Sequence, residues 1–326
     1  MKASFNTHFK ALVLAAGLVS AFGAQASSTV IFDPTGTVGP ANDVAFTTLD
    51  QRPGNALAIG ASASSPVGTT FNLVYQSNLG SALDGNGNAV FNNGTVIGGA
   101  ARNFTFTAGF AETITGNTVV GGSNTVLTFG FASPASNAPT ATNFFYMYAT
   151  GASGNNLAGT GFASGIQILS GHFIASGYSS TFNANGGGAG QPLDAAGTND
   201  YAGISTITGS GSTNATLVID GFNAAYFPNL VLGATSSFIQ TTQSLQFQQV
   251  DPSALMSSNG IANGNITGAS VAEVGTVNGI NGRSTIFQAD ASQSFVTGVP
   301  EPLPAALIGL GLVALGLARR KAAKKD

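Results

Sequence analysis

Hydrophobic and polar residues alternate in short runs along most of this chain. In the run 103–107, Phe104 and Phe106 alternate with Thr105 and Thr107, so an extended strand would place the two rings on one face. Such runs, rich in β-branched and aromatic residues, are typical of antiparallel strands. They predict strands at 70–76, 103–107, 125–131, 143–148, 167–174, 204–208, 215–220 and 244–248.

Clusters of Gly, Asn and Ser separate these runs and predict the connections. The segment 117–124 contains Gly121-Gly122 and reads as part of a hairpin connection. The Gly/Asn-rich segments 183–190 and 257–264 are expected to be surface loops, and 291–298 a linker to the C-terminal segment.

The pattern indicates an all-β protein, and an antiparallel two-sheet β-sandwich of the jelly-roll kind is the expected architecture. The chain has 23 phenylalanines and no tryptophan, and Phe fills the space between two sheets without polar atoms to satisfy. A β-solenoid is the alternative, which the lack of an internal repeat disfavours. There is no cysteine, so stability must come from burial and hydrogen bonding.

The N-terminal segment has the order of a secretory signal peptide. Lys2 and Lys10 precede an apolar run at 11–22, and Ala24 and Ala26 form a small-residue cleavage site. We expect a signal helix over 1–26 that is cleaved after Ala26, which leaves a body at 27–298 that is long enough for one domain. The secretion translocon and signal peptidase are the implied partners.

The C-terminal segment, 299–326, combines three parts. Val299, Pro300, Glu301 and Pro302 form a short tag, and the uncharged apolar run 303–318 follows it. As a helix this run would be roughly 24 Å long, slightly short of a ~30 Å hydrocarbon core. The basic residues behind it would stay on the cytoplasmic side of the membrane; they are Arg319, Arg320, Lys321, Lys324 and Lys325.

These three parts, in this order, resemble the PEP-CTERM sorting signal of Gram-negative bacteria. The resemblance implies recognition by an inner-membrane exosortase and removal of the tail near the Pro300–Pro302 tag. The protein would be membrane-anchored transiently and then released to the cell surface or the extracellular matrix. A permanent single-span anchor is the alternative.

The charge of the body is unusual. Between residues 27 and 298 there are eleven acidic residues against Arg52, Arg102 and Arg283, a net charge of −8. An acidic surface disfavours nucleic acid, because phosphate binding depends on basic side chains. It allows calcium binding or solubility in a hydrated matrix.

Catalytic machinery is sparse in the sequence. His172 is the only histidine of the body, and no G-x-S-x-G elbow, thiol nucleophile or His-based zinc set occurs. Asp194 and Asp200 are the nearest loop pair for carboxylate chemistry on sugars. Turn-forming aspartates are the favoured interpretation of that pair, and no catalytic residue is assigned.

Oxygen-bearing side chains alternate in the loop 84–88. Asp84, Asn86 and Asn88 resemble the start of a calcium loop, and calcium is the only cofactor that the sequence suggests. Ala89 and Thr95, however, stand where an EF-hand needs Gly and Glu. A hairpin turn explains the segment equally well.

Two further features bear on association. The six tyrosines could stack on sugars, although packing in or beside the sheet is the favoured role. The segment 241–250 is uncharged, Gln-rich and free of proline, which suits a self-associating cross-β edge. An ordinary internal strand is the favoured alternative.

The body resembles the flocculation-associated PEP-CTERM proteins of floc-forming bacteria over nearly its whole length. The resemblance implies a role in cell aggregation through an exopolysaccharide matrix, and it transfers no catalytic residue and no disulfide. The segments that carry it are 54–60, 71–80, 104–115, 156–162, 207–213, 225–230, 247–253 and 275–295.

The sequence therefore predicts an exported, non-enzymatic matrix protein that promotes aggregation together with exopolysaccharide or with copies of itself. A secreted polysaccharide-acting enzyme that uses carboxylates, and a self-assembling fibre protein, are the alternatives from other classes.

Overall fold

Alternating runs along the chain become one large antiparallel sheet. The computed structural model describes residues 29–122, 124–198, 201–242, 245–254, 256 and 284–296, which all belong to one compact unit. The expected signal helix at 1–26 and the tag, apolar helix and basic cluster at 299–326 lie outside the described residues.

Strands account for most of the described chain, and two short 3₁₀ turns, η1 (Pro40–Asn42) and η2 (Asn185–Gly187), lie between them. The strands are β1 (Val30–Phe32), β2 (Val44–Phe46), β3 (Thr48–Gln51), β4 (Gly54–Ile59), β5 (Thr70–Leu83), β6 (Ala89–Asn92), β7 (Thr95–Ile97), β8 (Ala100–Val120), β9 (Asn124–Phe131), β10 (Phe144–Thr150), β11 (Ile166–Ala184), β12 (Gly190–Pro192), β13 (Ser205–Ile207), β14 (Gly209–Phe222), β15 (Thr235–Thr242) and β16 (Ser284–Val296).

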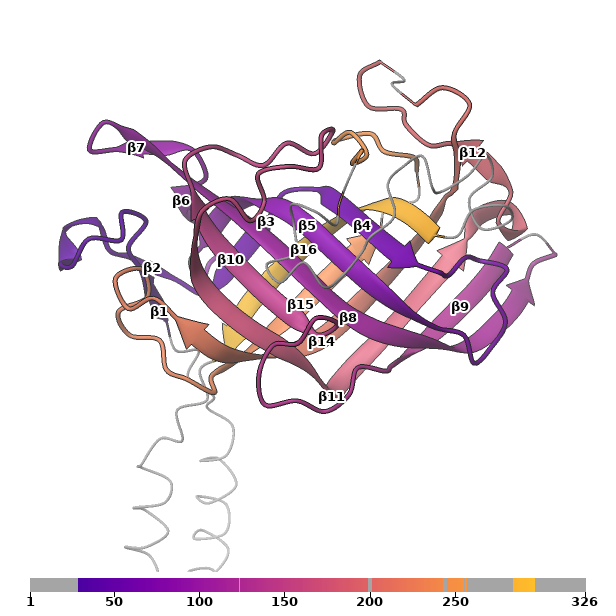
Figure 1. The fold of residues 1–326 in the computed structure, drawn as a ribbon, viewed down its shortest axis with the longest axis horizontal. Coiled ribbons are helices and arrows are strands. Elements are labelled where there is room, and N and C mark those ends of the chain that lie inside the picture. The colour runs from indigo at the N-terminus through magenta and orange to yellow at the C-terminus, as the bar shows by residue number, and fades with distance from the viewer. Residues whose placement is uncertain are drawn as a thin grey trace, which may run out of the picture. The chain divides into compact units, whose positions relative to one another are not determined.

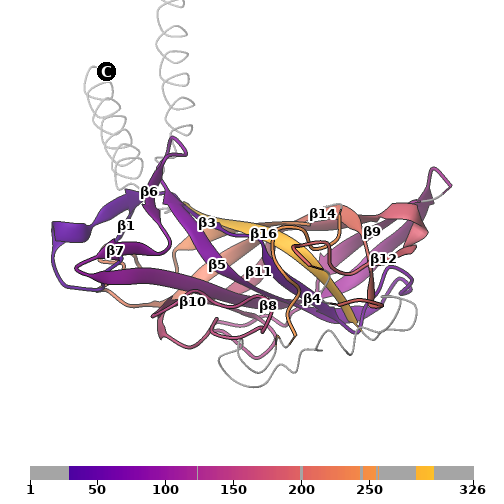
Figure 2. The ribbon, with the colours of Figure 1, turned by 90° about the horizontal axis from the view of Figure 1, so that it is seen from above.

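The main sheet has 12 strands and closes on itself (Figures 1 and 2). Going round the ring, β5, β8, β11, β14, β15 and β16 each fill a position alone. β9 and β10 together fill the position between β8 and β11, and β3 and β4 together fill the one between β16 and β5. The all-β, antiparallel prediction is confirmed, whereas the two-sheet sandwich is not, because the layers belong to one continuous hydrogen-bonded sheet.

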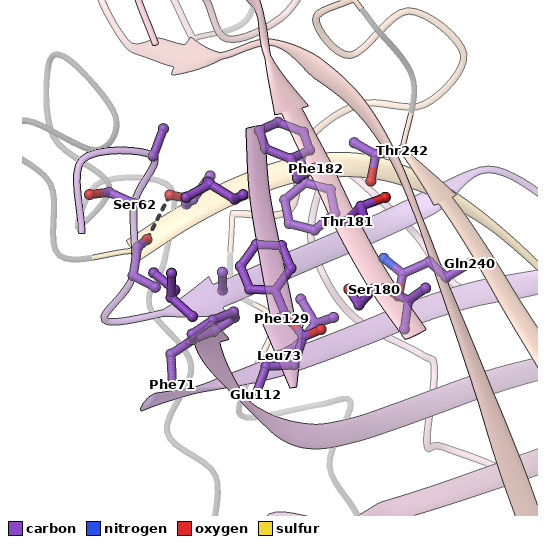
Figure 3. A pocket seen from close by; sticks show the side chains of 18 residues that line it. Ser62, Phe71, Leu73, Glu112, Phe129, Ser180, Thr181, Phe182, Gln240 and Thr242 are labelled. Atoms are coloured by element: carbon purple, nitrogen blue, oxygen red, sulfur yellow. Dashed lines mark hydrogen bonds between the residues drawn. The ribbon is translucent and has the colours of Figure 1, made fainter. Parts of the chain in front are cut away.

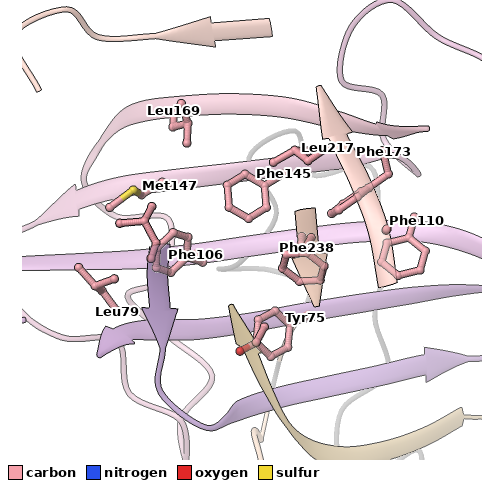
Figure 4. Packing of buried hydrophobic residues seen from close by; sticks show 14 of the residues in the cluster. Tyr75, Leu79, Phe106, Phe110, Phe145, Met147, Leu169, Phe173, Leu217 and Phe238 are labelled. Carbon is pink, nitrogen blue, oxygen red and sulfur yellow. The ribbon is translucent and has the colours of Figure 1, made fainter. Parts of the chain in front are cut away.

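The interior of the closed sheet is packed with aromatic rings (Figure 4). Phe238 of β15 is fully buried, and its ring centroid lies 5.3 Å from that of Phe173 and 6.1 Å from that of Phe145, both in edge-on geometry. Phe104 and Phe106 point inward, as the alternation predicts. Burial of each ring removes apolar area from water without leaving a polar atom unsatisfied.

One end of this interior is plugged by a small hairpin. β1 pairs with β2, and Phe32 and Phe46 from these strands are fully buried. The Phe32 ring lies 5.3 Å from Phe227 and 5.0 Å from Phe104. The hairpin therefore completes the core at the end of the ring where β8 begins.

Loops cover part of the outer face of the sheet, and polar side chains attach them. Asn55 of β4 and Gln76 of β5 both donate a hydrogen bond to Ser253 Oγ, the second at 2.9 Å. Thr105 of β8 donates to the carbonyl oxygen of Phe162 at 2.7 Å. This explains why outward-facing polar residues such as Thr105 are nevertheless buried.

Apolar contacts reinforce the same covered face. Leu57, Val74 and Tyr146 point outward from the sheet and form a second buried cluster with Leu193 and Phe247, which come from the overlying loops. The sheet thus carries a main core inside the ring and a smaller one outside it.

The strand predictions hold for seven of the eight runs. The runs that begin at 70, 103, 125, 143, 167, 204 and 215 all lie in or overlap strands. At the turn after β8, Gly121 and Gly122 have φ of 64° and 78°, a conformation that favours glycine in a tight hairpin. β11 extends into the expected loop 183–190, as far as Ala184.

Two predictions about the C-terminal half are wrong. The run 244–248 is not a strand where it is described, because Phe247 turns into the outer cluster and residues 245–250 follow the surface of the sheet. Residues 291–296 are not linker: they are the end of β16, which pairs with β15 on one side and β3 on the other. The loop predicted at 257–264 lies outside the described residues.

Within the described part of the chain, no helix has the length and apolar character required to cross a membrane. The apolar run 303–318 is not among these residues.

We expect the inward and outward positions of β15 to differ sharply in their effect on stability. Phe238→Ala should lower the free energy of unfolding by about 3–5 kcal/mol, because it removes a ring from the packed interior. Its neighbour Ile239 points outward and is 37% exposed, so Ile239→Ala should cost less than ~1 kcal/mol. Urea denaturation of the two variants measures both values, and equal losses would contradict the assigned face of β15.

Candidate functional site

A face rich in hydroxyl groups runs across the outside of β3, β16, β15, β14 and β11. Residues of β14 and β15 alternate between buried and partly exposed, and the partly exposed set points away from the packed interior. We call this set the hydroxyl face. Its members are Thr48, Thr181, Ser212, Asn214, Thr216, Ser237, Thr241, Ser292 and Ser294.

Strand pairing aligns these side chains in rows across the sheet. In one row Thr48 lies opposite Ser294, Ser294 opposite Ser237, and Ser237 opposite Thr216. The hydroxyl oxygens of Thr48 and Ser294 are 3.0 Å apart. Because neighbouring strands lie about 4.8 Å apart, this row forms a regular line of hydroxyl groups on a rigid support. In the next row the apolar Ile239 stands between Ser292 and Asn214.

The carboxylates of Asp50 and Asp290 lie among the side chains of the hydroxyl face. Asp50 of β3 lies opposite Ser292 of β16. Asp290 of β16 lies opposite Thr241 of β15. Burial, and secondly the charge of Asp50, raise the pKa of Asp290 to about 6. Burial also raises the pKa of Asp50. The fold therefore brings together a carboxylate pair that is far apart in sequence.

The predicted carboxylate pair, Asp194 and Asp200, is only half described. Asp194 is buried, its Oδ1 accepts a hydrogen bond from the Ala196 backbone N–H at 2.8 Å, and Asp200 lies outside the described residues. The contact of Asp194 with its own turn agrees with the turn-forming role favoured from the sequence.

The calcium candidate forms the turn between β5 and β6. Asp84 Oδ1 accepts hydrogen bonds from the backbone N–H groups of Asn86 and Asn88 at 2.9 and 2.8 Å, and Oδ2 accepts one from Asn88 Nδ2 at 3.2 Å. These bonds lower the pKa of Asp84, those from Asn88 most strongly. A calcium ion would have to replace them, so the geometry favours the hairpin-turn interpretation, and calcium binding stays a prediction.

His172 is held as a packed side chain. It is buried, and its Nδ1 lies 2.7 Å from Asp220 Oδ2 on the neighbouring strand. Within the described residues Asp220 is its only side-chain hydrogen-bond partner. The described residues also contain no group of three or more His, Cys, Asp or Glu side chains arranged to hold a metal ion.

The tyrosines occupy the packing positions favoured from the sequence. Tyr75, Tyr146 and Tyr148 are buried, and the other three tyrosines are half-buried. The burial of Tyr75 and Tyr148 raises the pKa of each phenol far above its usual value.

A cavity of about 70 Å³ lies at the end of the closed sheet opposite the β1–β2 plug (Figure 3). Strands from all around the ring line it, including β4, β5, β8, β9, β11, β14, β15 and β16. We call it the end cavity. Half-buried rings, among them Phe129, Phe182 and Phe287, surround its mouth, whereas its floor is buried.

Glu112 is the acidic residue of the end cavity. It is 3% exposed, and Tyr178 donates a hydrogen bond to its Oε1. Burial raises its pKa from 4.5 to about 7, although hydrogen bonds from Tyr178 and Ser180 act in the opposite direction. Ser180 and Thr213 lie beside it, with their hydroxyl oxygens 2.8 Å apart.

Sequence reasoning missed Glu112 and the Asp50–Asp290 pair. Glu112 is an even number of residues from the inward-facing Phe104, Phe106 and Phe110 on β8, so it lies on the same face of the strand. The alternation along the sequence therefore already indicated that Glu112 is buried. No such signal existed for Asp50 and Asp290, because only the pairing of β16 with β3 brings them together.

The chain was compared with models of protein families, with curated proteins and with solved structures, and none of the three comparisons gave a match.

Glu112 predicts a specific pH dependence of stability. Its pKa is raised in the folded state, so folding favours its neutral form, and stability falls as pH rises from about 4.5 to about 7. Glu112→Gln removes this loss. We expect the stability of the variant relative to the parent to rise by roughly 3 kcal/mol between about pH 4 and about pH 8.

Asp84→Asn is the matched control, since its sign is opposite. Because the pKa of Asp84 is lowered in the folded state, its ionised carboxylate stabilises the fold at pH values above the pKa of the unfolded chain. That contribution is lost as the pH falls through the folded-state pKa. The Asp84→Asn variant should therefore have a lower free energy of unfolding than the parent at neutral pH, and the difference should shrink in acid. Urea titrations across this pH range measure both, and a parallel pH profile for Glu112→Gln and the parent would contradict a neutral, buried Glu112.

Proposed function

We propose that this protein is an exported, non-enzymatic matrix protein that promotes cell aggregation in association with exopolysaccharide. The structural observation that carries the proposal is the hydroxyl face, a mostly uncharged set of Ser, Thr and Asn side chains aligned across a rigid sheet and interrupted by Ile239. Hydroxyl-rich polymers present the same kinds of donor and acceptor, so the two surfaces are chemically complementary.

Each contact between this face and a polysaccharide is weak, but many contacts together give strong binding. Each hydrogen bond to a sugar replaces one to water, so its net contribution is only about 0.5–1.5 kcal/mol. A long polysaccharide engages many such contacts on one or several copies of the protein, and avidity then exceeds the single-site affinity. A matrix component needs this behaviour more than it needs tight recognition of one sugar.

The acidic charge of the body fits the same role. The net charge of −8 over residues 27–298 keeps copies apart in solution and disfavours nucleic acid. Copies then meet through a shared polymer, which links cells without requiring the proteins to aggregate.

Delivery rests on the two ends of the chain. In this proposal the translocon and signal peptidase export the chain and remove residues 1–26. The PEP-CTERM-like tail then holds it in the inner membrane until an exosortase processes it near Pro300–Pro302. The body reaches the cell surface or matrix.

Hydroxyl removal tests the binding face. The triple variant Thr48→Val, Thr216→Val, Thr241→Val keeps the shape and strand preference of each side chain but deletes three hydroxyl groups. We expect the purified body to lose about 5–30-fold in affinity for floc exopolysaccharide, equivalent to ~1–2 kcal/mol. Co-sedimentation with the polymer measures the change.

The matched control removes three hydroxyl groups from loops, with Thr140→Val, Thr142→Val and Thr160→Val, and should leave binding unchanged. If both triple variants co-sediment equally with the exopolysaccharide, the result would contradict the role of the hydroxyl face. Cleavage of the polysaccharide that is abolished by Asp290→Asn would establish an enzyme instead. Thioflavin-positive fibres with cross-β diffraction would establish a fibre protein.

Deletion of residues 299–326 tests delivery independently. We expect the truncated protein to leave the cell-surface fraction and flocculation to fall, because the sorting signal is gone. Immunoblots of cell fractions and a settling assay measure the two effects. Unchanged location together with unchanged settling would contradict the sorting role of the tail.

A further inference from the structure

We propose that the end cavity binds a small uncharged amphiphile, a molecule with a short hydrocarbon body and a hydroxyl head. This goes beyond the proposed function, since it concerns the inside of the ring rather than its outer face. The inference rests on the shape of the cavity, its apolar wall and an unsatisfied polar atom in its lining.

The wall of the cavity is apolar. Phe71, Leu73, Ile114, Leu127 and Phe129 contribute to it from three neighbouring strands, β5, β8 and β9 (Figure 3). Filling an apolar cavity with hydrocarbon restores contacts that its lining atoms lack, which favours a ligand with an apolar body.

The polar end of the lining provides the binding site for a hydroxyl head. Gln240 of β15 is 3% exposed, and its Oε1 has no hydrogen-bond partner among the described residues. A buried carbonyl oxygen without a donor is costly, at about 1–3 kcal/mol. A ligand hydroxyl would donate to this atom and remove that cost.

Glu112, Ser180 and Thr213 complete the polar end. Burial raises the pKa of Glu112 to about 7, and an uncharged head is compatible with both protonation states of this carboxyl group. A ligand carboxylate would be buried beside a carboxyl group in an acidic protein, which is unfavourable for both. An alcohol is therefore preferred over the corresponding acid anion.

The size of the cavity limits the ligand. At roughly 10–15 Å³ for each water-sized group, about 70 Å³ has room for roughly five to seven such groups. A linear alcohol such as 1-pentanol, with six heavy atoms, would fill it with its tail toward the half-buried rings at the mouth. A Kd on the order of 1 mM is reasonable for so small a ligand.

Nuclear magnetic resonance titration of the body with 1-pentanol and with pentanoate tests the proposal. Saturable binding of 1-pentanol should shift signals of residues in the end cavity, and pentanoate should bind at least about tenfold more weakly at neutral pH. Absence of saturable 1-pentanol binding, equal binding of pentanoate, or shifts confined to the hydroxyl face would overturn the proposal.

Gln240→Leu and Gln293→Leu form a matched pair of variants. Both glutamines are buried in the ring with an Oε1 that has no partner among the described residues, but only Gln240 lines the end cavity. Gln240→Leu should weaken 1-pentanol binding about tenfold without unfolding the protein, since it removes an unsatisfied polar atom.

Gln293→Leu should leave the affinity unchanged, and equal effects of the two substitutions would contradict the assigned binding site. Because this readout does not involve exopolysaccharide, its failure and the failure of the proposed function are separate results.

Discussion

Closure of the antiparallel sheet is the constraint on which this structure depends. The pairing of β16 with β3 and β4 joins the last described strand to two of the earliest, and the main-chain groups of each long strand find partners on both sides. An open sheet of this length would expose edges that recruit other chains. The closed sheet also fixes an inside, where phenylalanine rings pack without disulfides.

Closure also separates the chemistry of the two faces. Inside, apolar packing leaves a small cavity whose polar end is formed by Glu112 and Gln240. Outside, loops cover the part of the sheet around β4, β5 and β10, while the hydroxyl face on β14, β15 and β16 stays accessible. The same alternation of residues along β15 supplies Phe238 to the core and Thr241 to the surface. One strand pattern therefore supports both a stable body and a candidate binding face.

Much of the fold follows from local sequence, and the remainder depends on long-range pairing. Alternation predicted β5, β8, β9, β10, β11 and β14 and the inward direction of Phe104 and Phe106. It could not distinguish a closed sheet from a sandwich, because both bury one face of every strand. It failed at 244–248, where Phe247 packs outside the ring, and at 291–296, whose Ser and Gln content resembles a linker. The Asp50–Asp290 pair was not foreseeable, since it depends on which strands are neighbours.

The most direct test of closure uses the absence of cysteine from the chain. Thr48 on β3 and Ser294 on β16 are far apart in sequence, yet their hydroxyl oxygens are 3.0 Å apart in a cross-strand pair. The double variant Thr48→Cys, Ser294→Cys places two thiols within bonding reach. Mass spectrometry after mild oxidation should find an intramolecular disulfide in nearly all of the folded protein. Two free thiols in a protein that remains folded would contradict the closed sheet.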